Sequence, residues 1–360
     1  MIVSSQSLLL VSRKYSLAEY SGCCNQKICL AYLQLETFIF DEAVTAGGRF
    51  MYFKEQNILL CAIDHGFSTI KTPHFIFDNG VEEIGTEATL EAKTMECKDT
   101  FYKIGEGRLP MKNTKIQDED YLLLTYAAIA KEIEYYGLSG EDVIRVVVAA
   151  GLPFTRFGEE KVSFSNYLKR GLVTFVYEGK TYFIEIEEVL LYPQCYAAVA
   201  NILGKLAPNQ LIVDIGSKTI DIIHNKNYVP VERECITIPE ALINCMANVN
   251  KAVFRRKNRY LDESDIQDVM MTGTSNLPKE ITEIVQDQLC IFAENVEAQL
   301  KENGFDPELT PIVYVGGGAT VMKLFGRIRG ANICYQEDVK ANAIGYEYLA
   351  LQKVDRWLHE

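Results

Sequence analysis

Two apolar runs separated by a short polar turn form the most informative pattern along the chain. In the segment Leu211–Asp221, the first run carries Asp214 near its end, and Gly216, Ser217 and Thr219 precede the second run. This pattern predicts a β-hairpin rather than a strand followed by a phosphate-binding loop and a helix. Gly216 lets the backbone approach a ligand closely, and the N–H groups and hydroxyls of the turn can hold phosphate oxygens.

The carboxylate of Asp214 comes at the end of a strand that we expect to be buried. A charged group has little reason to lie there unless it meets a cation, most simply through water bound to Mg²⁺. Taken alone, the hairpin is equally well interpreted as a plain tight turn.

The same pattern occurs about 150 residues earlier, in Leu59–Thr72. An apolar strand leads to Asp64, one residue and Gly66, and the returning strand ends in Lys71, a cation that can reach a phosphate. Two such hairpins predict two similar half-domains that face each other across one nucleotide.

A third element completes this set near the C-terminal end. The buried strand predicted for Ile312–Val315 leads into Gly316, Gly317 and Gly318, and a helix is predicted over 320–328. Glycines in this position allow a flat or phosphorylated ligand to come close to the backbone.

Hydrophobic periodicity predicts the elements between these motifs. Helices are expected over 118–136, 195–206, 238–253, 261–271, 277–303 and 341–358. A central strand is expected over 144–149, a hairpin over 173–186 and a short strand near 101–105.

In combination, these motifs resemble the actin/DnaK-chaperone/sugar-kinase superfamily, which has two phosphate motifs and an adenosine motif in this order. Within it, the chain is similar to the plasmid-segregation actins of the ParM/StbA type, from about Asn57 to about Ala350. The residues that carry this likeness are Ala150–Pro153, Phe157-Gly158, Tyr167-Leu168, Tyr192–Gln194 and Ala341–Tyr346.

The resemblance implies an α/β protein with the actin-like (ribonuclease H-like) two-domain fold and a nucleotide in the interdomain cleft. Domain I is expected over 51–205, with a small inserted subdomain at about 82–117 and completion by the C-terminal helix 341–360. Domain II is expected over 206–340. Residues 1–50 do not match the family pattern, and our hypothesis is that Met51 is the natural initiator. A regulatory extension is the alternative.

The resemblance also assigns ligands. Asp64 and Asp214 are expected to hold hydrated Mg²⁺. The residues expected to bind ATP, with GTP as the alternative, are Gly66, Ser68, Thr69, Lys71, Gly216, Ser217, Lys218, Thr219, Gly316, Gly317, Gly318 and Ala319.

Three residues are the candidates for catalysis of ATP hydrolysis: Gln194, Asp214 and Asp221. Gln194 stands where the superfamily places a water-orienting Gln or Glu, and an amide can align water without taking its proton. A polar residue at a helix N-terminus is the alternative for Gln194. For Asp221 we keep three roles open, namely support of the Mg²⁺ shell, general base and structural partner.

The function implied is an actin-like ATPase that polymerises into nucleotide-dependent filaments and segregates plasmid DNA through a DNA-bound adaptor protein. The formal net charge of −13 argues against direct nucleic-acid binding. No apolar run is long enough to span a membrane, and ten cysteines without metal-like spacing suit reduced thiols in a cytoplasmic protein. The alternatives are a cell-shape or division actin scaffold and a small-molecule kinase of the same superfamily.

Some conspicuous residues are assigned ordinary roles. We interpret His65 as a turn filler and Asn342 and Gly345 as hinge and packing residues. The basic run Arg255–Arg259 is interpreted as a solvated helix end, with base stacking or a filament contact as the alternative.

Overall fold

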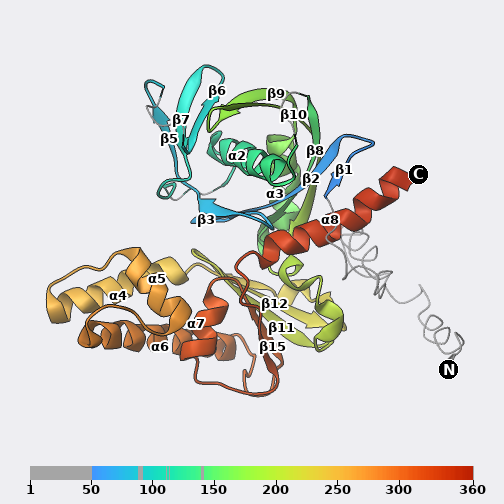
Figure 1. Ribbon diagram of the computed structural model, residues 1–360. Coiled ribbons are helices and arrows are strands. Elements are labelled where there is room, and N and C mark those ends of the chain that lie inside the picture. The colour runs from blue at the N-terminus through green and yellow to red at the C-terminus, as the bar shows by residue number, and fades with distance from the viewer. Residues whose placement is uncertain (1–50, 88–91, 111, 113, 139–141, 360) are drawn as a thin grey trace, which may run out of the picture. The chain divides into compact units, whose positions relative to one another are not determined.

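The computed structural model describes residues 51–87, 92–110, 112, 114–138 and 142–359. The expectations for residues 1–50 therefore concern a segment outside the described residues. The described chain forms two β-sheets with flanking helices (Figure 1), which confirms the predicted α/β class.

The first sheet is formed by β1 (Tyr52–Phe53), β2 (Ile58–His65), β3 (Thr69–Lys71), β4 (Ile76–Asp78), β5 (Val81–Ile84), β6 (Thr94–Cys97), β7 (Thr100–Ile104), β8 (Ile144–Leu152), β9 (Arg170–Tyr177) and β10 (Lys180–Pro193). Their order is β4-β3-β2-β8-β10-β9-β6-β7-β5, with β1 beside β2. The central strands β2, β8 and β10 are parallel. Every residue of β2 is buried, as expected for a central strand covered on both faces.

The second sheet is formed by β11 (Gln210–Ile215), β12 (Ile220–Lys226), β13 (Val229–Pro230), β14 (Ile236–Ile238), β15 (Ile312–Val315) and β16 (Ile333–Tyr335). Their order is β13-β12-β11-β15-β16, with β14 beside β12. The hairpin β11–β12 therefore adjoins two parallel strands, β15 and β16. The hairpin β2–β3 adjoins β8 and β10 in the same way, so the pattern repeated in the sequence is also repeated in the topology.

The helices are α2 (Asp120–Tyr135), α3 (Phe154–Leu168), α4 (Leu242–Lys257), α5 (Glu263–Thr272), α6 (Lys279–Glu302), α7 (Gly318–Phe325) and α8 (Ala341–His359). Helix α2 lies within the curve of the first sheet (Figure 1), and its apolar residues belong to that sheet's core. Helices α4, α5 and α6 pack together around a core of their own. Helix α8 packs against β2 and β8. None of the helices described is long and apolar enough to cross a membrane.

The helix predicted over 195–206 is wrong. This segment forms two short 3₁₀ turns, Ala197–Val199 and Leu203–Lys205, and Cys195 has a positive φ of 68°. Its backbone is bound to α8 instead, because the Cys195 N–H donates to Asn342 and the Ala197 carbonyl lies against Gly345. Tertiary contacts therefore override the local helix propensity here.

Helix α3 was not predicted from the sequence. Only Phe164 and Leu168 of this helix are buried, so it lacks the apolar stripe by which a helix is recognised. The other predicted helices and strands are present with ends shifted by a few residues, although the helix expected over 238–253 is displaced to α4. Strand β6 pairs with β9, so the segment expected as an inserted subdomain extends the first sheet. The division of the chain into domains stays a prediction.

Candidate functional site

The first hairpin holds a buried ion pair. Asp64 and Lys71 are register partners on β2 and β3, and Lys71 Nζ donates to Asp64 Oδ2 over 3.3 Å. Burial raises the pKa of Asp64, but the charges of Lys71 and Lys115 outweigh this effect and hold its pKa below the ordinary value. Asp64 is therefore an ionised carboxylate at neutral pH.

The second hairpin places two carboxylates opposite each other. Asp214 and Asp221 are register partners on β11 and β12, and both are buried. Burial, together with the negative charges of Asp221 and Asp64, raises the pKa of Asp214 to about 7, against the opposing effect of a hydrogen bond from Asn342. Since Asp64 influences Asp214, the two hairpins bring their carboxylates into one electrostatic site.

Asp221 is anchored by two hydroxyl groups. Thr237 Oγ1 donates to its Oδ1 over 2.6 Å, and Thr219 Oγ1 donates to its Oδ2 over 3.0 Å. Burial raises the pKa of Asp221, while these hydrogen bonds oppose the rise. Of the three roles that the sequence left open for Asp221, the structural one has direct contacts in its favour.

Two consecutive residues join the hairpins. Gln194 Nε2 donates to Asp64 Oδ1 over 2.9 Å, and the N–H of the next residue, Cys195, donates to Asn342 Oδ1 over 3.0 Å. Asn342 Nδ2 in turn donates to Asp214 Oδ2 over 2.8 Å. A single chain of contacts therefore runs from Asp64 through the Gln194–Cys195 segment and α8 to Asp214.

The turn of the first hairpin offers a hydroxyl group to a ligand. Ser68 Oγ is buried and finds no hydrogen-bond partner among the described residues. The Gly66 carbonyl accepts a hydrogen bond from Asn79 Nδ2, and a Cβ at Gly66 would lie 2.5 Å from the carbonyl oxygen of Thr69. The backbone of the turn is therefore fixed by these contacts, and the hydroxyl of Ser68 remains available to donate a hydrogen bond to a ligand.

The turn of the second hairpin contacts the first. Lys218 Nζ lies 4.4 Å from the centroid of the Phe67 ring and 3.5 Å from the carbonyl oxygen of Lys112. The carbonyls of Gly216 and Ser217 accept hydrogen bonds from the first N–H groups of α4, which fixes the turn on that helix. The predicted residue Lys218 thus lies between the two hairpins.

The glycine run packs closely against the end of β11. A Cβ at Gly316, which has a φ of +77°, would lie 2.3 Å from Asp214 Oδ1, and one at Gly318 would lie 2.2 Å from Ile215 Cγ2. At Gly317 the nearest atom to such a Cβ would be 3.5 Å away, and Ala319 is fully buried. Close packing thus accounts for Gly316 and Gly318, whereas a side chain at Gly317 would make only an ordinary contact with Leu242.

Sequence reasoning missed two residues of this site. Asn342 was expected to serve packing, yet it binds Asp214. Lys115 belongs to no motif, yet it is buried and its charge lowers the pKa of both Asp64 and Asp221. For Asn342 the available signal was an amide inside the otherwise apolar motif Ala341–Tyr346, and for Lys115 the sequence offered no signal. His65 is fully buried and its Nε2 lies 2.8 Å from Thr125 Oγ1, as a packing role requires.

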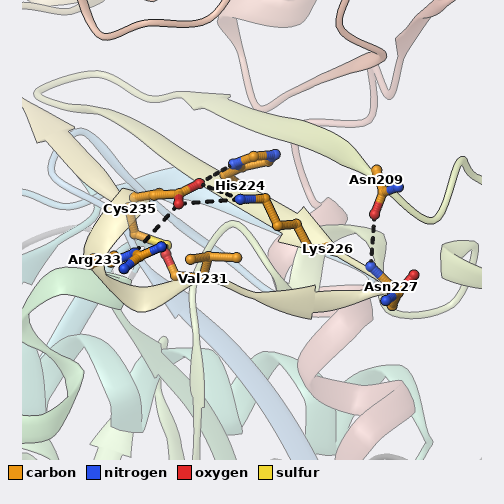
Figure 2. Close-up of polar contacts among 8 residues, drawn as sticks. Asn209, His224, Lys226, Asn227, Val231, Arg233 and Cys235 are labelled. Carbon is orange, nitrogen blue, oxygen red and sulfur yellow. Dashed lines mark hydrogen bonds and ion pairs between the residues drawn. The ribbon is translucent and has the colours of Figure 1, made fainter.

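Another polar cluster lies along β12 and the turn that follows it (Figure 2). Glu234 accepts from His224 Nδ1 over 2.5 Å and from Lys226 Nζ over 3.2 Å, and Arg233 lies close by. Each cation here already has the Glu234 carboxylate as its partner. This cluster is a partly exposed ion-pair network that fixes the turn, and we do not assign it a ligand.

The comparisons with known proteins agree with the fold. Residues 91–196 match the family model described as "Actin like proteins N terminal domain". No curated protein sequence matches the chain.

Solved structures match over most of the chain. The archaeal actin homolog Ta0583 is 16% identical, with 82% of this chain and 99% of that chain covered and a TM-score of 0.65. The ParM of Bacillus thuringiensis, solved with ATP, is 17% identical (82% and 99% covered, TM-score 0.63). A ParM from Clostridium botulinum, solved as a 15-stranded filament, is 20% identical (81% and 99% covered, TM-score 0.60).

The chain therefore has the two-sheet α/β fold of the actin-like proteins. Within that class its fold is similar to that of the ParM proteins, as the motifs predicted.

Proposed function

We propose that the protein is an actin-like ATPase that binds ATP and Mg²⁺ between its two hairpins and polymerises into filaments that segregate plasmid DNA. The observation that carries the proposal is the contact chain from Asp64 through Gln194, Cys195 and Asn342 to Asp214. A nucleotide at this point would contact both hairpins, so its state can influence both sheets.

The donor set suits a hydrated Mg²⁺. Burial and the negative charges of Asp221 and Asp64 raise the pKa of Asp214, so a cation bound beside this buried carboxyl would stabilise its ionised form. Among the described residues no three or more His, Cys, Asp or Glu side chains form a direct metal cluster. Oxygen ligands that are few in number favour a Mg²⁺ that keeps most of its water.

The remaining predicted residues are assigned to the nucleotide. Lys71 and the buried hydroxyl of Ser68 would hold phosphates on one side, together with Gly66 and Thr69. Gly216, Ser217, Lys218 and Thr219 would hold them on the other, and Gly316–Ala319 would face the adenosine, with Gly317 giving the closest approach. Bound Mg²⁺ would neutralise charge on the phosphates during hydrolysis.

Gln194 is assigned to the attacking water. Its amide already lies 2.9 Å from Asp64 and belongs to the segment that joins the hairpins. Positioning of water in line with the terminal phosphate contributes much of the catalysis of phosphoryl transfer, since little covalent chemistry falls to the protein. Asp221, held by Thr219 and Thr237, would support Asp214 from the neighbouring strand.

Filament formation and the segregation of plasmid DNA are proposed from the likeness to ParM. The related ParM of Clostridium botulinum forms a filament. With a net charge of −13, this chain is a poor direct ligand for DNA, so an adaptor protein would connect the filament to the plasmid. Head-to-tail contacts that do not close on themselves would let copies of the chain add indefinitely.

Light scattering of the full chain tests the proposal. Purified protein with Mg²⁺ receives ATP, GTP, a non-hydrolysable ATP analogue or no nucleotide, and phosphate release is recorded in parallel, with Asp214→Ala as the variant. We expect a nucleotide-triggered rise that decays as phosphate is released, and altered kinetics in the variant. Hydrolysis without scattering at every protein concentration would exclude the filament and favour the kinase, whereas no nucleotide binding would refute the proposal altogether.

A further inference from the structure

Lys115 is a buried cation for which the described residues provide no ion-pair partner. Its side chain lies in the segment between β7 and α2, and the residue is only 7% exposed. Across the described part of the chain, no carboxylate lies within ion-pair distance of its Nζ and no hydrogen bond from it is found. Burial lowers the pKa of Lys115 to about 8, with the charge of Asp64 opposing the fall.

The contacts that Lys115 does make are too weak to explain its burial. Its Nζ lies 5.9 Å from the Phe67 ring and 5.8 Å from the Phe164 ring. Cation–π contacts at this distance stabilise the protein by much less than the free energy that is lost when an ammonium group is removed from water. A desolvated lysine of this kind is stabilised when an anion binds beside it.

The position of Lys115 points to the phosphate region of the site. Phe67, which it contacts, is in the turn of the first hairpin between Gly66 and Ser68. The Nζ of Lys218, in the second hairpin, also lies over the Phe67 ring. The charge of Lys115 acts on carboxylates of both hairpins, since it lowers the pKa of Asp64 and of Asp221.

We propose that Lys115 binds a phosphate oxyanion between the two hairpins, either the terminal phosphate of a bound nucleoside triphosphate or the inorganic phosphate that hydrolysis leaves behind. The proposal rests on the nucleotide site assigned above. Lys71 donates to Asp64 and Lys218 donates to the carbonyl of Lys112. Among the described lysines of the site, Lys115 is thus the one with neither an ion pair nor a hydrogen bond, and we assign it to the phosphate that distinguishes ATP from ADP.

The segment that carries Lys115 also contacts the second half of the chain. Arg108 donates to Glu263 at the start of α5, with Nη2 2.5 Å from Oε2. The carbonyl of Lys112 accepts from Lys218. A phosphate held by Lys115 would therefore stabilise the contacts of Arg108 with Glu263 and of Lys112 with Lys218. Release of the phosphate would weaken these contacts, so the conformation of this segment would depend on the bound nucleotide.

The test compares Lys115→Met and Lys115→Arg with the wild-type chain. Calorimetric titrations with Mg²⁺ use a non-hydrolysable ATP analogue, ADP, and ADP in the presence of excess inorganic phosphate. Lys251→Met, at an exposed position of α4, is the matched control. Thermal unfolding without nucleotide verifies folding, and we expect Lys115→Met to be at least as stable as the wild type because it removes a desolvated charge.

We expect Lys115→Met to lower affinity for the ATP analogue by about tenfold or more, with ADP affinity changed less than about threefold, and Lys115→Arg to lie between. If Lys115→Met binds the analogue as the wild type does, but inorganic phosphate no longer raises its affinity for ADP, then Lys115 binds the released phosphate and not the terminal phosphate of the triphosphate. The inference would be overturned if a folded Lys115→Met variant kept the wild-type ratio of analogue affinity to ADP affinity and also kept the wild-type effect of inorganic phosphate on ADP affinity. A wild-type chain that binds no nucleotide would refute the proposed function itself.

Discussion

Asn342 Nδ2 donates a 2.8 Å hydrogen bond to Asp214 Oδ2, and this bond joins the C-terminal helix α8 to the second hairpin. The other end of the same amide accepts from the Cys195 N–H, next to Gln194, which binds Asp64. One asparagine thus couples both carboxylates of the site. Its position, 128 residues from Asp214 in the sequence, makes α8 part of the candidate site.

Replacement of Asn342 by alanine would leave the Cys195 N–H and the Asp214 carboxyl without their partner. A buried group left unsatisfied costs about 1–3 kcal/mol, so we expect the free energy of unfolding to fall by that amount, with weaker nucleotide binding. Urea unfolding and calorimetric titration measure the two effects. Asn303→Ala, at the exposed end of α6, should change stability by less than about 0.5 kcal/mol. Equal effects of both variants would contradict the role assigned to Asn342.

Replacement of Gln194 by alanine should slow phosphate release by about 10²-fold, since it removes the group that orients water. Nucleotide affinity should change little, because no phosphate contact is assigned to Gln194. Single-turnover phosphate release and equilibrium binding separate the two quantities. Gln267→Ala, on the exposed face of α5, serves as the control. A Gln194→Ala variant that loses binding and hydrolysis in parallel would show that Gln194 only holds Asp64 in place.

Gly345 allows α8 to lie directly on the 3₁₀ turn at Ala197. A Cβ at this position would be 1.9 Å from the Ala197 carbonyl oxygen, so Gly345→Ala must displace one of the two backbones. We expect a loss of about 1–3 kcal/mol in unfolding free energy. Gly85→Ala, where no atom lies within 4 Å of the new Cβ, should be close to neutral. Denaturant titration of both variants measures the difference between their losses of unfolding free energy. Equal losses in the two variants would show that α8 does not pack on the turn at Ala197.

Glu347 of α8 makes stability dependent on pH. Burial, together with the charge of the nearby Glu132, raises its pKa to about 7. The folded chain therefore holds a proton that the unfolded chain releases near pH 4.5, so unfolding free energy decreases as pH rises from about 4.5 to about 7 and then levels.

Glu347→Gln should remove this decrease. We expect the variant to be more stable than the wild type above pH 7, by on the order of 2 kcal/mol, and nearly equal to it at pH 5. Thermal or urea unfolding across this pH range provides the measurement. A variant that is destabilised equally at both pH values would refute the assignment.

Much of the candidate site was accessible from the sequence because its parts are local. The two hairpins at Asp64 and Asp214 and the glycine run at Gly316 were recognisable from short apolar and polar patterns, and the structure forms each of them. The helix expected after Gln194 was wrong, because contacts with α8 that lie far away in the sequence determine the backbone there.

The sequence by itself determined the repeated hairpins, the α/β class and the resemblance to actin-like proteins, since each depends on periodicity and turn chemistry within a few residues. Only the tertiary structure decided that Asn342 binds Asp214, that Gln194 binds Asp64 and that Lys115 is buried beside Phe67 in the first hairpin. The two hydrogen bonds join residues 128 and 130 positions apart. Local sequence patterns do not predict such pairs, because the burial of each residue and its polar partners depend on distant segments that become neighbours only in the folded chain.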